Sequence, residues 1–181
     1  MKKLALLLVC FLMASGTSFS QTYGSVSPTF TIQANVQSAL TVAELTPLEF
    51  GQLFQGYAKY VAPTGVSTPT VGGIPTGAAT FSIAGAINRE VSITFTNHTS
   101  ISDGSTSIPI SYGSDDARAQ AGTSATPPTS GWNPTTLGGT VTLDGSGDAR
   151  VFLGGTATTT TANAAGAYSA TGTITVGYTG V

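Results

Sequence analysis

The residues that could carry chemistry are few and lie far apart in this sequence. His98 is the only histidine, and Cys10, the only cysteine, lies close to the N-terminus. A zinc site or a nucleophile–base pair needs several such side chains brought together. Asn97, His98 and Thr99 also match a glycosylation acceptor triplet, which is a weak signal on its own. We therefore predict that His98 is a surface residue at the end of a strand, with no catalytic or metal-binding role.

The carboxylates do not form a convincing site either. Asp144, Ser146 and Asp148 alternate as at the start of a calcium-binding loop, but the distal bidentate glutamate is missing. A polar hairpin turn explains this spacing better. We expect Asp115 and Asp116 to form a solvated pair in a loop, and nothing in the sequence places any two carboxylates as an acid and a base. The sequence predicts no enzyme activity, no cofactor and no metal.

Three aromatic residues leave one binding hypothesis open. Trp132, Tyr57 and Tyr60 lie in polar, loop-like surroundings. They could form a surface on which sugar rings stack, or they could cover the edge of a hydrophobic core. The first reading makes the protein a monomeric, adhesin-like sandwich that binds carbohydrate through its loops. We keep this as the alternative function.

The composition restricts the fold that could position these residues. Charged residues are 8% of the chain, against about 25% in a typical soluble protein, while hydrophobic residues are 40% and glycine numbers 23. Exposed helix faces need Glu, Lys and Ala, so a helical bundle is excluded. Lys and Arg together number six, too few to neutralise many phosphates, so the sequence predicts no nucleic-acid partner. An all-β protein remains.

The first twenty residues have the pattern of a bacterial secretory signal peptide. Lys2 and Lys3 precede an apolar run over residues 4–13, and a small-x-small triplet ends at Ser20. The run is too short to span a membrane. We expect cleavage before Gln21, an extracellular or cell-surface location, and a mature chain without cysteine or membrane span.

Short stretches of period-two alternation recur along the mature chain. They include 81–83, 91–96, 141–143 and 151–153, with turn residues between them. This spacing is typical of a β-sandwich. We interpret 63–77 and 111–134 as long surface loops and 168–178 as the last strand, in which Ile174, Val176 and Tyr178 face the same way. The expected domain covers residues 38–181.

The segment after the signal peptide alternates for longer than one strand can. Apolar residues occupy even positions from Val26 to Val42, about 56 Å when extended, whereas strands are about 20 Å long. A break near residues 35–38 divides it into an arm, residues 21–37, and a first domain strand. The arm could be part of a strand that kinks within its own domain, or a donor strand that completes the sheet of a neighbouring copy. The donor residues would be Val26, Phe30, Ile32, Ala34 and Val36.

Two groups of residues resemble bacterial surface proteins. The C-terminal element, with Gly166, Tyr168, Ile174, Val176 and Tyr178, looks like the closing strand of fimbrial subunits. The whole mature chain resembles a family of small secreted pilin-like β-sandwich proteins of unassigned function, related to fimbrial and spore-coat-U-type subunits. Further elements that carry this resemblance are Leu48, Phe50 and Gly51, and Gly154 and Gly155.

The resemblance implies an immunoglobulin-like sandwich with an N-terminal extended strand. It also implies a structural subunit of an extracellular filament or pilus that polymerises head to tail by donor-strand insertion. The expected partners are identical subunits and, for export, an assembly chaperone or an outer-membrane secretion protein. The low surface charge fits this function, because it offers little repulsion between copies.

Overall fold

The computed structural model describes residues 31, 36, 38–68, 76–96 and 99–180. The predicted signal peptide, His98 and all of the predicted arm except residues 31 and 36 lie outside this part of the chain. The fold below is that of the described residues between 36 and 181.

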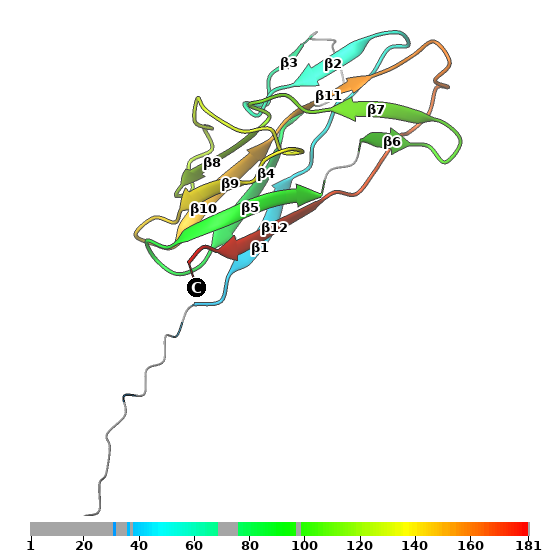
Figure 1. Ribbon diagram of the computed structural model, residues 1–181. Coiled ribbons are helices and arrows are strands. Elements are labelled where there is room, and N and C mark those ends of the chain that lie inside the picture. Colours follow the sequence, from blue (N-terminus) through cyan, green and yellow to red (C-terminus); the bar gives the residue numbers. More distant parts are fainter. Residues whose placement is uncertain (1–30, 32–35, 37, 69–75, 97–98, 181) are drawn as a thin grey trace, which may run out of the picture. The chain divides into compact units, whose positions relative to one another are not determined.

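The described part of the chain consists of antiparallel strands and turns without any helix (Figure 1). This confirms the predicted all-β sandwich. No helix among these residues could therefore cross a membrane. The strands are β1 (Thr41–Thr46), β2 (Ala58–Val61), β3 (Ser67–Thr68), β4 (Ala79–Ala84), β5 (Glu90–Thr96), β6 (Ser100–Ser102), β7 (Ser107–Ser111), β8 (Ala117–Ala121), β9 (Gly139–Thr142), β10 (Asp148–Leu153), β11 (Gly155–Thr158) and β12 (Thr173–Tyr178).

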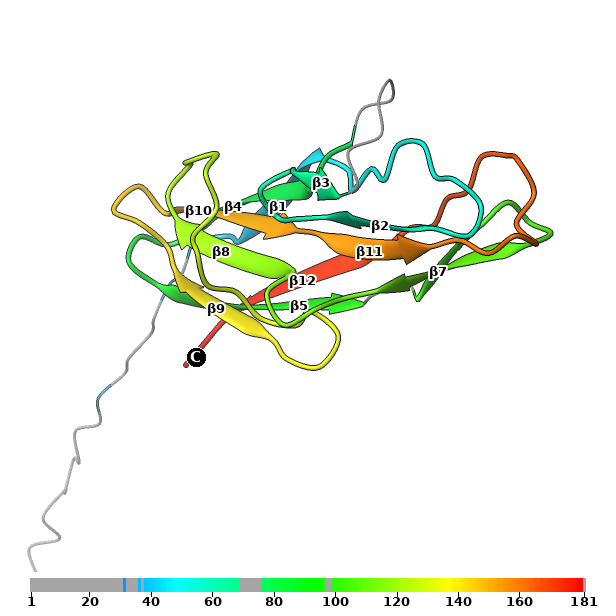
Figure 2. The same ribbon diagram turned by 90° about the horizontal axis from the view of Figure 1, so that it is seen from above.

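Two sheets pack face to face and enclose the first core. One has the strand order β1-β4-β10-β8 and the other β12-β5-β9 (Figure 2). The alternation in β5 places Val91 and Ile93 inside, where both are fully buried, while Thr94 faces out. Ile174, Val176 and Tyr178 all pack against this core, so they share a face as predicted. The buried core residues are Ile83, Val91, Ile93, Leu143, Ala149 and Val151.

A third sheet, of order β3-β2-β11-β7-β6, continues from the first through Gly154. The chain passes there from β10 directly into β11. A Cβ on Gly154 would lie 2.3 Å from the carbonyl oxygen of Val61, so only glycine allows this close approach of the two backbones. The second core lies on this sheet and consists of Phe50, Val61, Ile108, Ile110 and Ala157.

Three of the predicted elements are wrong. The stretch 63–77, predicted to be a loop, contains β3, which pairs with β2 and, with two residues, is too short to show an alternation. The stretch 111–134, predicted to be a loop, contains β8, which pairs with β10. Its inward residues are the alanines Ala117 and Ala119, whose small side chains give too weak an alternation to recognise. The last strand, predicted over 168–178, begins only at Thr173. Before that point the chain forms a single isolated bridge, between Ser169 and Ser102.

Candidate functional site

The two edges of the face-to-face sheets differ. At one edge β8 and β9 pack together, and the loop between them carries Trp132, which packs against the core. We call this the closed side. At the other edge, β1 is hydrogen-bonded only to β4, and β12 only to β5. No described strand joins β1 to β12, so this open side presents two unpaired strand edges.

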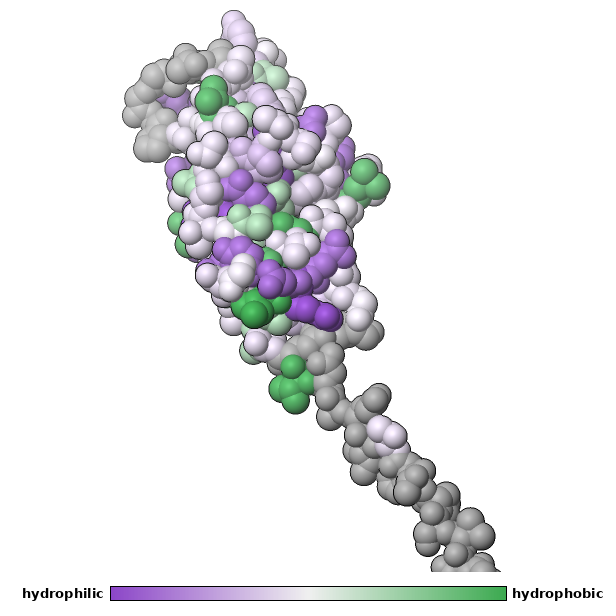
Figure 3. Space-filling view, turned by 90° about the vertical axis from the view of Figure 1, so that its left-hand side faces the viewer, coloured by the Kyte–Doolittle hydropathy of each residue, from purple (hydrophilic) through white to green (hydrophobic). Residues whose placement is uncertain are grey.

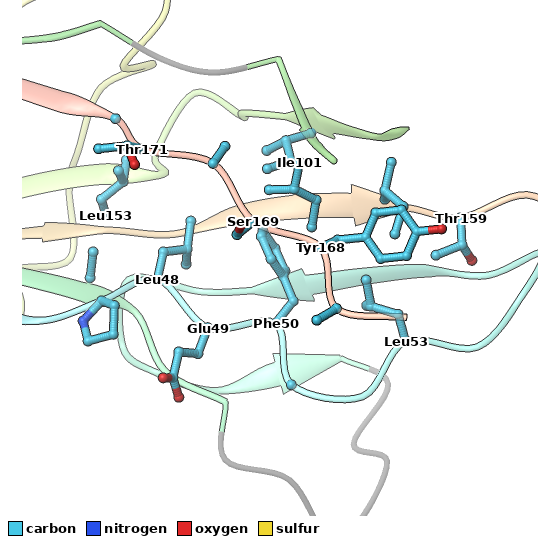
Figure 4. A pocket seen from close by; sticks show the side chains of 18 of the residues that line it. Leu48, Glu49, Phe50, Leu53, Ile101, Leu153, Thr159, Tyr168, Ser169 and Thr171 are labelled. Carbon is cyan, nitrogen blue, oxygen red and sulfur yellow. The ribbon is translucent and has the colours of Figure 1, made fainter. Parts of the chain in front are cut away.

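A groove of about 1700 Å³ runs along the open side (Figure 4). One wall is formed by β1 and by the segment that follows it, up to Tyr57. The other is formed by β12 and by the preceding residues, from Asn163. Side chains from both cores point into it. The main apolar residues that line it are Leu48, Phe50, Leu53, Phe81, Phe95, Ile101, Leu153 and Ile174.

The exposure of β1 shows that no described part of the chain covers this strand on the open side. A strand in a two-sheet sandwich normally buries every second side chain. All six residues of β1 are exposed instead, including Val42, which is 38% exposed and lines the groove. The groove therefore leaves apolar surface and backbone polar groups uncovered where another strand would lie.

Beyond the groove, which reaches Val42 on β1 and Ile174 on β12, the open side ends at Tyr178, and we call this the Tyr178 end of the open side. The backbone N–H of Ala86 donates to the Tyr178 hydroxyl at 2.6 Å, and this hydroxyl donates to the carbonyl oxygen of Ser38 at 3.0 Å. Leu40 packs against the first core beside them. A Cβ on Gly85 would lie 2.5 Å from the Tyr178 hydroxyl, so glycine leaves room for this arrangement. The chain is thus anchored just before β1 begins.

The opposite end lies beside Phe54, Tyr57 and Tyr168, and we call it the Tyr57 end. The Tyr168 hydroxyl is 2.6 Å from Oγ1 of Thr106 and donates to the carbonyl oxygen of Ala164 at 2.9 Å. Figure 4 shows the Tyr168 ring close to Ile101 and Leu53. These contacts hold the segment before β12 against the β6–β7 hairpin, so it forms a defined wall.

Most residues of the fimbrial-like and family-like elements come together around this groove. Gly51 adopts a positive φ of 62°, which favours glycine, and directs the chain along the wall. Gly155 lies against the ring of Tyr112, where a Cβ would approach within 3.1 Å. Val176 and Tyr178 pack into the first core. The residues of these elements that line the groove are Leu48, Phe50, Gly51, Gly166, Tyr168 and Ile174.

The donor residues Val26, Phe30, Ile32 and Ala34 lie outside the described residues. Val36 is described and is 92% exposed. The sequence analysis did not identify the groove itself. Phe81 and Phe95, whose rings contact each other at a centroid distance of 6.0 Å, resemble ordinary core residues. They line a groove only because no described strand covers them on the open side.

The groove has few charges. Glu44 and Glu49 line it, and none of its lining residues is Lys or Arg. A long uncharged segment would therefore meet mainly apolar side chains and unpaired backbone. Among the described residues, no group of three or more His, Cys, Asp or Glu could hold a metal ion.

The turn at Asp144 is a polar hairpin turn, as the sequence predicts. Oδ1 of Asp144 accepts hydrogen bonds from the backbone N–H groups of Ser146 at 2.8 Å and Asp148 at 2.9 Å, which closes the hairpin turn before β10. The bond from Asp148 is the main reason that the Asp144 pKa lies below its usual value. Asp103 has the same arrangement in the β6–β7 turn, with the N–H groups of Thr106 and Ser105.

The prediction for Asp116 is wrong, because this carboxylate is only 3% exposed. It accepts hydrogen bonds from the Tyr60 hydroxyl at 2.9 Å and from the N–H of Gly113 at 2.6 Å. Burial, followed by this hydrogen bond, raises the pKa of Tyr60 to about 12. The pair links β2 to the turn before β8 and lies apart from the groove lining.

Of the three aromatics of the carbohydrate hypothesis, only Tyr57 is largely exposed, at 66%. Tyr60 is bonded to Asp116. Trp132 packs over Gly139 at the closed side, where a Cβ on that glycine would lie 2.4 Å from the indole. The three do not form one stacking surface.

The fold and the groove together define a class of protein, a β-sandwich with an apolar groove along one side. The chain belongs to the DUF4402 family, described as a domain of unknown function, whose model matches residues 40–178. The match spans the described sandwich from Leu40, just before β1, to Tyr178. No curated protein matches the chain, and no solved structure does.

Proposed function

We propose that this protein is the structural subunit of an extracellular filament, in which the groove of one copy receives the N-terminal arm, residues 21–37, of the next. The observation that carries the proposal is the open side of the sandwich. Two unpaired strand edges, β1 and β12, flank an apolar groove there. An added strand would satisfy both edges and cover the groove.

The arm has the composition that such a groove requires. It contains no charged residue, and the groove lining has no cation to pair with one. Phe30, Ile32, Ala34 and Val36 would project from the same face of a strand, because strand side chains alternate. Burial of each large apolar side chain contributes about 1.5–3 kcal/mol. Burial of these side chains would therefore contribute several kcal/mol to insertion, before the cost of ordering the arm is subtracted.

The direction of the arm decides whether the assembly closes. An inserted arm that runs antiparallel to β12 ends at the Tyr57 end of its acceptor, whereas its own domain starts at the Tyr178 end. The Tyr178 end of each subunit then meets the Tyr57 end of the next, so the chain of subunits grows without closing. The reverse direction would bring two Tyr178 ends together in a closed pair.

The test is a disulfide between arm and groove. The expected mature chain has no cysteine, so Ile32→Cys combined with Leu48→Cys introduces a single possible pair; Phe30→Cys and Ala34→Cys sample neighbouring registers. We expect a ladder of covalent oligomers on a non-reducing gel for at least one of the three. A cross-linked monomer would instead mean that each arm folds back into its own groove.

The matched control keeps the arm cysteine and moves the other to Val66, which is 62% exposed and does not line the groove. We expect no ladder from this pair. A ladder of equal strength with the control, or no cross-link at any of the three arm positions, would contradict the proposal. An exported subunit with an open groove would also need a protecting partner before assembly, which is the role that we propose for a chaperone or secretion protein.

A further inference from the structure

Exposed apolar residues lie at both ends of the open side, on segments that are held by hydrogen bonds. At the Tyr178 end, Ile87 is 59% exposed in the turn between β4 and β5. At the Tyr57 end, Phe54 is 45% and Tyr57 is 66% exposed, and both line the groove. Large apolar side chains that are exposed on a fixed backbone are typical of contact surfaces.

Ile87 lies where the arm leaves its own domain. Its neighbour Ala86 donates its backbone N–H to the Tyr178 hydroxyl, which in turn donates to Ser38. Leu40 is packed into the first core and cannot move with the arm. The last donor residue, Val36, is four residues earlier, a span of about 13 Å when fully extended.

This short span limits the distance between two subunits joined by the arm. If Val36 of the donor lies at the Tyr57 end of the acceptor, Leu40 of the donor lies within about 13 Å of that end. The turn that carries Ile87 must then lie close to the acceptor's Phe54 and Tyr57. A longer linker would have left the two domains free of each other.

The loop at the Tyr57 end is built to hold its aromatic side chains in place. The N–H of Tyr57 donates to Oγ1 of Thr159 at 3.1 Å, and that hydroxyl donates to the carbonyl oxygen of Tyr57 at 2.8 Å. The side-chain amide of Gln55 donates to the carbonyl oxygen of Asn163.

Residues 54–57 and residues 86–88 include no charged side chain, so the two segments do not repel each other electrostatically. The face shown in Figure 3 is mostly near neutral in hydropathy, with separate hydrophobic groups.

We infer that residues 86–88 of one subunit pack against residues 54–57 of the next, and that this second contact stabilises the filament beyond the inserted arm. The inference rests on the proposed function, because the arm sets which ends meet. The partner is a second copy of this chain, and the contact is heterologous, since different surfaces of the two copies meet.

The experiment uses the full secreted chain with Ile87→Asp or Tyr57→Lys. Both residues are exposed, so the fold should be retained, and urea unfolding checks this. We expect each change to raise the lowest concentration that forms sedimentable filaments about tenfold, because an apolar contact is lost. The two changes combined in one chain place opposite charges at the contact, and we expect this double variant to assemble better than either single variant.

A peptide of residues 24–38 separates this contact from arm insertion. It is titrated against full chains in which the arm is disabled by Phe30→Asp with Ile32→Asp. Chains that also carry Ile87→Asp, at a residue that does not line the groove, should bind it within about twofold of those that do not, a difference well under 1 kcal/mol. Tyr57→Lys is left out of this comparison, because Tyr57 lines the groove. Val66→Asp, at a residue of similar exposure, is the control for an added charge and should leave assembly unchanged.

Each result decides between the two proposals. If the peptide fails to bind any arm-disabled chain, the proposed function fails, and the end contact falls with it. If the peptide binds but Ile87→Asp and Tyr57→Lys assemble like the wild type, only the end contact is overturned. The same holds if Val66→Asp impairs assembly equally, or if the double variant assembles no better than the single ones.

Discussion

The closed and open sides of the sandwich are built from the same kinds of residue, yet only at the closed side is the core covered. At the closed side, β8 and β9 pack together and Trp132 covers the core. At the open side, β1 and β12 flank a groove, and every residue of β1 is exposed. Both sides end in strands that are hydrogen-bonded on one side only, β8 and β9 at the closed side and β1 and β12 at the open side. The difference is that β8 and β9 pack together, whereas β1 and β12 leave a groove between them.

The comparison shows how a subunit can be stable and incomplete at once. The first core lies between β4, β10 and β5, away from the open edge, and its six central residues are fully buried or nearly so. The groove is lined by half-buried side chains such as Phe81 and Phe95. The apolar surface that stays partly exposed is therefore concentrated in the groove, where a partner strand could bury it.

The largest expected effect compares an isoleucine of the core with one of the groove. Ile93 is 0% exposed, so Ile93→Ala should lower the free energy of unfolding by about 2–5 kcal/mol, through lost burial and a cavity. Ile101→Ala, in the half-buried groove lining, should cost about 1 kcal/mol in a monomeric subunit, because water already reaches it. Urea unfolding of both variants measures the difference, and equal losses would show that the groove is as well packed as the core.

A smaller effect is expected where the two cores join. Gly154→Ala places a Cβ 2.3 Å from the carbonyl oxygen of Val61, and relief of that overlap should cost about 1–3 kcal/mol. The control is Gly145→Ala, where a Cβ would meet no atom within 4 Å. Thermal unfolding should separate the two. Similar stabilities would argue that the strand can change sheets without this close approach.

The Tyr178 end provides the next test. Tyr178→Phe removes the hydroxyl that links Ala86 and Ser38, and should lower stability by about 0.5–1.5 kcal/mol. Hydrogen exchange at Ala86 should also become faster, because its N–H loses its acceptor. Tyr57→Phe, at the other end and 66% exposed, serves as the control. A stability change as large in the control would contradict an anchoring role for Tyr178.

The smallest effect is a pH dependence of the Tyr57 end. The N–H groups of Thr106 and Ser105 stabilise the charged carboxylate, so the pKa of Asp103 lies below its usual value. The stability that this turn contributes is present above the ordinary pKa, near 3.9, and is lost as the pH falls through the lowered value. Asp103→Asn should weaken this acid dependence slightly, as measured by unfolding between about pH 5 and about pH 2. An unchanged dependence would show that the turn is held by other contacts.

The sequence predicts individual strands and turns better than it predicts the edges of the sandwich. The alternation in β5 and the turn at Asp144 identify their elements directly, because each signal is local. β8 escapes detection because its inward residues are alanines. The groove escapes for a different reason, since Phe95 and Ile174 carry the same pattern whether their neighbour is a strand of this chain, a strand of another copy, or water.

The amino-acid sequence by itself determined that the protein is all-β, poor in charge, and provided with more alternating sequence at its N-terminus than one strand can use. These features follow from composition and from the period of the side chains along the chain. The tertiary structure alone decided which sheet edge remains unpaired, and that Leu48, Tyr168 and Ile174, far apart in sequence, line one groove. The physical reason is that the pairing of strands depends on contacts between distant segments, which no local pattern records.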